Sequence, residues 1–239
     1  MEKGSVKEID FYSDALQEEL KLLIYIPPNF TPLVKHSVLI ASDGRDYFQL
    51  GRIARLADEL HDDFEIENLI IVGVPYKNAK DRQRKYIPTG DLFEAYVRFL
   101  AHELVPYLDE EFPTLQMGMG RGLIGDSMAG TISLLTAITY PHIFGKVIMQ
   151  SPYVDRHVME AVQNFSQVDA LSVYHITGKQ EDRVLTTDKQ IRDFLTPNRE
   201  LHALMEERRF DVFYEEFDGN HTWKYWQPDL RRAIVENFS

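Results

Sequence analysis

The chain has 239 residues, of which 44% are hydrophobic, and its formal net charge is −12 at pH 7. This length and apolar content can fill one sizeable core, so we expect a single domain over residues 1–239. The acidic balance argues against a nucleic-acid partner, which requires a basic face. The absence of cysteine excludes disulfides and thiolate metal sites. The charged N-terminal segment and the lack of a long apolar run predict a soluble, cytoplasmic protein without a membrane partner.

Strands and helices alternate along most of the chain. In chain order, apolar periodicity predicts strands 6–12, 20–26 and 38–42, helix 48–60, strand 69–74, helix 91–112 with Asp91 as its N-cap, a strand closing at 123–124, helix 128–140, strand 147–150, a short helix from 155, strand 172–177, helix 188–208, strand 212–217 and helix 229–238. This order predicts an α/β fold with a mostly parallel central sheet and helices on both faces. The first two strands lack an intervening helix and predict an antiparallel edge.

The segment GLIGDSMAGT at 122–131 places Ser127 between small residues, after a predicted strand and before a predicted helix. GDSMAG is a variant of the G-x-S-x-G nucleophile elbow. Gly125 and Ala129 permit a tight turn that exposes the serine hydroxyl, and the following helix N-terminus favours a developing oxyanion. In such a sheet, ligands bind at the carboxyl ends of the strands. The alternative interpretation is a glycine-rich helix start without chemistry.

A serine nucleophile requires a base, and His221 is the histidine that the predicted topology favours. It follows Ser127 and lies in a loop after the last strand, where the GNH turn lets it reach back. The other histidines lie on predicted helices, within a strand or at the opposite end of the sheet: His36, His61, His102, His142, His157, His175 and His202.

The acid that orients the histidine is expected in the loop GKQEDR after strand 172–177. Glu181 is favoured narrowly over Asp182, and at least one of the two must be a solvated loop charge. Asp218 is a weaker third candidate.

The oxyanion hole is expected to combine the main-chain N–H of Met128 with a second donor from the loop SDGR after strand 38–42. Gly44 allows that backbone to turn inward, so the second donor is the N–H of Arg45 or of Gly44. An ordinary tight turn is the alternative.

Four further residues are candidates for substrate binding. Arg82 and Arg84 follow a strand and could meet an anionic or polyhydroxylated substrate, unless they belong to a solvated charge run. Tyr153 follows strand 147–150 and could face the site. Trp223 could stack on a sugar or catechol ring, although such aromatic clusters more often anchor a helix to the core. The short connection at 152–167 leaves no room for a large lid domain, which favours a soluble or short-acyl ester.

Four segments together resemble one esterase family: SDGRDYF, GDSMAG, GKQE and FDGNHTWKYW. The family includes the enterochelin esterases and esterase D, and the similarity runs from about residue 20 to the end. It implies an α/β-hydrolase fold and ester hydrolysis through an acyl-enzyme, with no metal or organic cofactor. Ser127 matches the nucleophile, His221 the base, and Glu181 a position where many members carry Glu. The RQRK segment with Arg82 and Arg84 resembles an Arg-containing stretch of siderophore-cleaving members.

The sequence departs from the family pattern at three points. Asp126 precedes the serine where His, Glu or Asn is commoner, and Ala129-Gly130 replaces Gly-Gly. The extra N-terminal domain of the larger enterochelin esterases is not expected either. We therefore expect a serine carboxylesterase acting on a small-molecule ester of short-acyl, siderophore or sugar type. A thioesterase or acyltransferase with the same triad, and a non-catalytic binding protein of this fold, stay as alternatives. A homodimer is a general expectation for such a protein.

Overall fold

The computed structural model describes residues 3–186 and 189–239. Among these residues, one sheet of eight strands runs in the order β1-β2-β4-β3-β5-β6-β7-β10. The strands are β1 (Ser5–Ser13), β2 (Glu18–Ile26), β3 (Ser37–Ser42), β4 (Leu69–Val74), β5 (Arg121–Asp126), β6 (Lys146–Gln150), β7 (Ser172–Gly178) and β10 (Asp211–Phe217). β2 pairs antiparallel with β1 and with β4, and the other neighbours are parallel. The predicted mostly parallel sheet with an antiparallel edge is confirmed.

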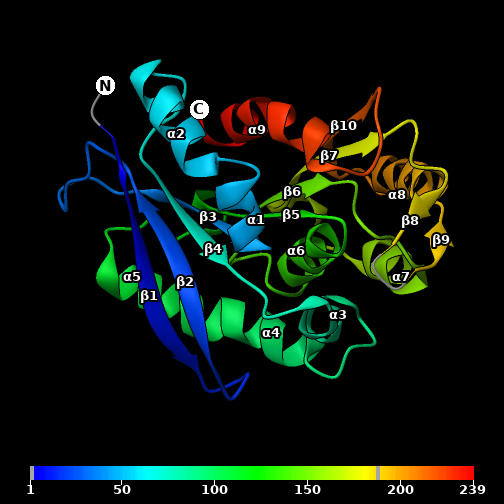
Figure 1. The fold of residues 1–239 in the computed structure, drawn as a ribbon, viewed down its shortest axis with the longest axis horizontal. Coiled ribbons are helices and arrows are strands. Elements are labelled where there is room, and N and C mark those ends of the chain that lie inside the picture. Colours follow the sequence, from blue (N-terminus) through cyan, green and yellow to red (C-terminus); the bar gives the residue numbers. More distant parts are fainter. Residues whose placement is uncertain (1–2, 187–188) are drawn as a thin grey trace.

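Helices cover both faces of the sheet (Figure 1). One face packs against α1 (Gly44–Gln49), α2 (Ile53–Asp62) and α9 (Trp223–Phe238). The other packs against α3 (Ala79–Tyr86), α4 (Phe93–Phe99), α5 (Val105–Glu111), α6 (Met128–Thr139), α7 (Arg156–Asn164) and α8 (Leu195–Glu207). Because helices lie on both sides, the central strands β4 and β5 are buried at every position.

Two predicted helices differ in the structure. The helix expected at 48–60 is divided into α1 and α2, because the chain turns at Arg52, whose φ is 53°. The helix expected at 91–112 contains a π-helical stretch, Leu100–Leu104, between α4 and α5. Asp91 does not cap it: Leu92 occupies the N-cap position, and the Asp91 carboxylate accepts a hydrogen bond from Arg84 instead.

The segment after β7 also differs from the prediction. The helix expected at 188–208 begins only at Leu195, and Asp188 lies outside the described residues. A small hairpin precedes it, formed by β8 (Val184–Leu185) and β9 (Ile191–Arg192). These strands are too short to give a recognisable alternation of polar and apolar residues.

Two more helices differ from the prediction for local reasons. The sequence predicts no helix or strand at 79–86, because AKDRQRKY has hardly any apolar residues, yet these residues form α3. The side chain of Asn78 caps this helix by accepting from the amides of Lys80 and Asp81. The last helix begins at Trp223 and continues through Pro228, which directly precedes the predicted start at residue 229. None of the helices in the described ranges is both long and apolar enough to cross a membrane.

Candidate active site

The turn between β5 and α6 holds Ser127 at φ 52° and ψ −124°. A residue other than glycine keeps a positive φ only where its surroundings enforce it, and here the Ser127 amide donates to the carbonyl of Gln150 at 2.9 Å. A Cβ on Gly125 would lie 2.1 Å from the carbonyl carbon of Ala129, so the turn requires glycine there. This strand–turn–helix geometry is the context in which a nucleophile elbow operates.

His221 lies in the loop between β10 and α9, beside a buried carboxylate. Its Nδ1 is 2.9 Å from Oε2 of Glu181. An ionised carboxylate only accepts hydrogen bonds, so Nδ1 carries the proton and Nε2 is left as the acceptor. The rings of Phe194 and Trp226 hold the imidazole, with centroid distances of 4.3 Å and 4.8 Å.

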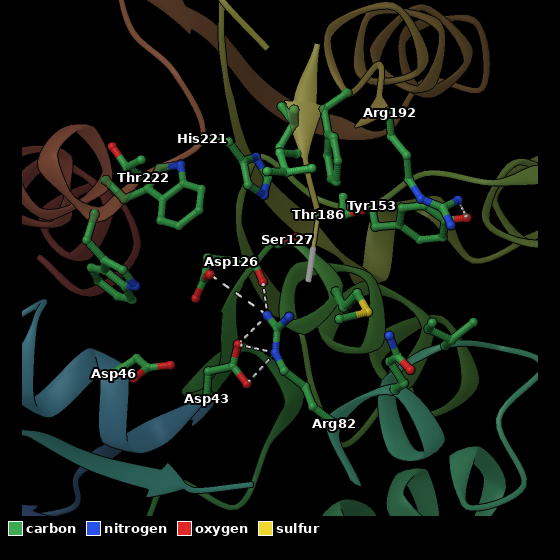
Figure 2. Close-up of a pocket in the computed structure, with 18 of the residues that line it drawn as sticks. Asp43, Asp46, Arg82, Asp126, Ser127, Tyr153, Thr186, Arg192, His221 and Thr222 are labelled. Atoms are coloured by element: carbon green, nitrogen blue, oxygen red, sulfur yellow. Dashed lines mark hydrogen bonds and ion pairs between the residues drawn. The ribbon is translucent and has the colours of Figure 1, made fainter. Parts of the chain in front are cut away.

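His221 and Ser127 line the same cavity (Figure 2). Between these two described residues the structure records no hydrogen bond. Catalytic hydrogen bonds often shorten only in the substrate complex, so this separation is compatible with proton transfer.

Glu181 is the acid that the structure brings to His221. Its side chain is fully buried, and its Oε1 accepts from the Ser151 hydroxyl at 2.7 Å and from the Gly178 amide at 3.0 Å. The other two candidates face solvent. Asp182 is exposed, and Asp218 accepts from an exposed lysine, Lys179.

The predicted oxyanion donors lie at two helix starts. Met128 opens α6 and Gly44 opens α1, and the first amides of a helix have no carbonyl partner within it. Met128 lines the cavity, as do Asp43 and Asp46 on either side of the Gly44–Arg45 pair. A Cβ on Gly44 would meet the backbone of β4 at 2.3 Å, so this loop lies directly on the sheet. The Arg45 side chain is exposed, so only its backbone can serve the site.

The two arginines proposed as substrate contacts behave differently. Arg82 lines the cavity, but its guanidinium is already engaged: Nε donates to both carboxylate oxygens of Asp43, at 2.9 Å and 2.8 Å. Its Nη2 also donates to Asp43 and to the main-chain carbonyl of Asp126, at 3.2 Å for the latter. Arg84 pairs with Asp91 at the surface and is absent from the described cavity lining.

Arg82 therefore connects two loops (Figure 2). Asp43 belongs to the loop that follows β3, and Asp126 immediately precedes Ser127 in the turn after β5. The side chains of Arg82 and Asp43 are 12% and 1% exposed, so water screens the pair little. The sequence indicated neither this partner nor the buried position of Arg82.

Asp126 contributes a second carboxyl group beside the same guanidinium. Its Oδ2 lies 3.9 Å from Arg82 Nη2, and its Oδ1 has no hydrogen-bond partner among the described residues. Burial raises the pKa of Asp126 to about 8, and the neighbouring Asp43 carboxylate adds to this effect. Burial also raises the pKa of Asp43, whereas Arg82 lowers it. We therefore assign the negative charge to Asp43, which has the bidentate partner, and the proton to Asp126.

The cavity next to Ser127 has a volume of about 420 Å³. Tyr153 and Trp223, the two aromatic candidates for substrate binding, both line it. One part of its wall is polar, with carboxyl groups on α1 and at the ends of β3 and β5. The remainder is mostly aromatic or aliphatic and includes Ile87, Met128, Tyr153, Val184, Leu185, Phe194, Trp223 and Trp226.

Several residues of the cavity wall are not among those predicted from the sequence. Val184, Leu185 and Arg192 reach the cavity from the unpredicted hairpin, and Arg192 lies over the Tyr153 ring at 5.6 Å. Tyr76 lies after β4 and donates its hydroxyl to Asp46 at 3.2 Å. The position of Tyr76 at the carboxyl end of a strand was the one signal that could have identified it.

Metal binding depends on several His, Asp or Glu side chains lying close together. Within residues 3–186 and 189–239, no three His, Asp or Glu side chains are grouped in a way that could hold one.

The fold and the serine turn define a class of protein. A mostly parallel sheet with helices on both faces, and a strained serine between a strand and a helix, are features of α/β-hydrolase-type esterases. The comparison with known proteins agrees. Residues 13–236 match the family described as "Putative esterase", and the chain belongs to this family. It is a hydrolase of the serine type that acts on carboxylic ester bonds.

Similar proteins include one near relative and many structures with the same fold. The chain is 53% identical to an uncharacterized protein of Bacillus subtilis (strain 168), YjcH, over 97% of this chain and 96% of that protein. A ferulic acid esterase structure superposes with a TM-score of 0.82 at 16% identity, covering 99% of this chain and 98% of the other. The enterochelin esterase of Shigella flexneri gives 0.83 at 17% identity, covering 97% of this chain and 57% of the other.

Proposed function

We propose that this esterase uses a Ser127–His221–Glu181 triad and an acyl-enzyme intermediate. The observation that carries the proposal is the 2.9 Å contact between His221 Nδ1 and the fully buried Glu181 carboxylate, at a cavity that Ser127 also lines. Nucleophile, base and acid each lie on a loop at the carboxyl end of a strand, in the chain order that α/β-hydrolases use.

The proposed reaction has two halves. Nε2 of His221 accepts the Ser127 proton as Oγ attacks the ester carbonyl, and the imidazolium then gives that proton to the leaving alcohol. A water molecule repeats the sequence on the acyl-enzyme and releases the acid. Glu181 keeps the imidazole in the productive tautomer and stabilises its cationic form. The N–H of Met128, with that of Gly44 or Arg45, would hold the oxyanion.

The cavity favours a small, neutral ester. Its volume of about 420 Å³ suits a short acyl chain or one ring. Asp43 already neutralises the Arg82 guanidinium, and Asp46 adds a further carboxyl group on the same side. An anionic substrate group would therefore find no free positive charge on that side, whereas hydroxyl groups would find acceptors. We propose a short-acyl or sugar-type ester, and rank an anionic siderophore ester below these.

Hydrolysis of p-nitrophenyl acetate and butyrate tests the proposal. We expect activity in the wild type, and a loss of at least about a thousandfold in kcat for Ser127→Ala and for His221→Ala. Glu181→Ala should lose far more activity than the matched variant Asp182→Ala, whose side chain is exposed. A fluorophosphonate probe should label wild type and leave Ser127→Ala unlabelled. Full activity in Ser127→Ala would refute the assignment, and parallel thioester substrates separate the alternative activity.

A further inference from the structure

A chain of hydrogen bonds runs from α9 to the acid loop through Ser151. The indole Nε1 of Trp226 donates to Ser151 Oγ at 3.1 Å, and Ser151 Oγ donates to Glu181 Oε1 at 2.7 Å. Glu181 Oε2 then faces His221 Nδ1. Ser151 and Glu181 are fully buried and Trp226 is 3% exposed, so water does not compete with these bonds.

The direction of this chain is fixed by chemistry. An indole N–H can only donate, so Ser151 Oγ accepts from Trp226. The single hydroxyl proton of Ser151 is therefore directed to Glu181, which as a carboxylate can only accept. Together with the Gly178 amide at 3.0 Å, the hydroxyl gives Oε1 two donors. A buried carboxylate without such donors would favour its protonated form.

Ser151 makes this contact from an unfavourable backbone conformation. Its φ is 50°, a value that residues with a side chain adopt rarely and that glycine adopts without cost. The turn is held by its amide, which donates to the carbonyl of Ile176 at 2.7 Å. Glycine would suit this turn better, so a serine at this position indicates that the hydroxyl has a role.

We propose that Ser151 is a positioning residue that keeps Glu181 ionised and oriented toward His221, and that Trp226 acts on the acid through it. The proposal rests on the triad proposed above. Ser151, directly after β6, thereby helps to set the pH range of the reaction. When the Ser151 hydroxyl is removed, Glu181 loses one of its donors, and the Glu181–His221 pair binds a proton more tightly.

The pH dependence of kcat/KM tests this role. His221 must be unprotonated at Nε2 to accept the serine proton, so proton uptake by the Glu181–His221 pair sets the acidic limb. In Ser151→Ala we expect that limb to move to higher pH by about one unit. Ser151→Gly should show the same shift and be more stable to heat than Ser151→Ala, because both lose the hydroxyl and glycine also relieves the positive φ. Ser133→Ala is the matched control, since Ser133 is a buried serine whose hydroxyl bonds a helix carbonyl in α6.

Trp226→Phe, alone and combined with Ser151→Ala, gives a double-mutant cycle. It removes the indole N–H and keeps an aromatic ring against His221. If Trp226 acts through Ser151, its effect on the acidic limb should largely vanish in the Ser151→Ala background. An acidic limb that stays in place in both Ser151→Ala and Ser151→Gly, whatever happens to kcat, would overturn the proposal.

A readout without turnover separates this test from that of the triad. The downfield NMR signal of the His221 Nδ1 proton, identified by its loss in His221→Ala, reports the titration of the Glu181–His221 pair directly. An upward shift of its midpoint in Ser151→Ala supports the coupling even if Ser127 proves not to be the nucleophile. An unchanged midpoint contradicts the coupling even if the esterase assay succeeds.

Discussion

Replacing Arg82 with methionine should strongly destabilise the protein, because it leaves Asp43 buried without its partner. Three hydrogen bonds join the guanidinium to the Asp43 carboxylate, and a fourth reaches the Asp126 carbonyl. Removing one partner of a buried pair typically costs about 3–5 kcal/mol. For a chain of this size that corresponds to a fall in Tm of about 6–20 °C.

Arg84→Met is the matched control, since Arg84 lies on the same helix, α3. Its pair with Asp91 is largely exposed, at 43% and 65% for the two side chains, so its loss should change the urea midpoint little. The assays are urea unfolding and turnover of p-nitrophenyl acetate. We expect kcat to fall at least about tenfold in Arg82→Met, because the loop that would carry the second oxyanion donor loses its tie to the serine turn.

A double variant tests the reasoning about the unpaired charge. Asp43→Asn combined with Arg82→Met leaves no buried ion alone, so it should be more stable than Arg82→Met by itself. If Arg82→Met unfolds at the same urea concentration as Arg84→Met, the pair contributes nothing measurable. The view of Arg82 as a connection between two loops would then be refuted.

Three further changes have defined outcomes. Glu181→Gln should lower kcat by at least about a hundredfold, whereas Asp182→Asn should keep a kcat near that of the wild type. Equal losses of kcat for the two variants in steady-state assays would contradict the choice of Glu181 as the acid. Gly125→Ala should abolish activity and lower Tm, because its Cβ would lie 2.1 Å from backbone of α6, and an active, stable variant would show that the turn can relax. The raised pKa of Asp126, about 8, means that the folded state holds an extra proton. The stability that this proton contributes is full at acidic pH and is lost as the pH rises through about 8. The unfolding free energy of the wild type should therefore fall relative to that of Asp126→Asn between pH 6 and 9. Parallel curves of unfolding free energy against pH would contradict this.

Much of the fold followed from the sequence because the central strands are buried on both faces. Such strands are uninterrupted apolar runs, and LIIVGV at 69–74 coincides with β4. The errors fall where apolar periodicity does not determine the structure. α3 has almost no apolar residues, and its start is determined by the side-chain cap at Asn78. The β8–β9 hairpin is too short to show a period.

In the candidate site, too, some residues could be predicted from the sequence and others could not. Ser127 and His221 could be selected from local signals: small residues that permit a strand–turn–helix geometry, and a histidine in a loop after the last strand. The choice between Glu181 and Asp182 could not be made locally, because it depends on burial that the surrounding loops create. The partner of Arg82 is 39 residues away in the chain, and no spacing rule relates α3 to the loop after β3.

The buried polar groups around the site explain why a mostly apolar core can hold this chemistry. Asp43 is held by Arg82, and Glu181 is held by Ser151, Gly178 and His221. A buried charge is tolerated only when other groups satisfy it, so each of these bonds stabilises the fold and also fixes a loop of the site. The same bonds occupy the guanidinium of Arg82, one of the two arginines that the sequence offered to an anionic substrate. The bonds that position these loops therefore also neutralise that guanidinium, which supports the proposed preference for a neutral ester.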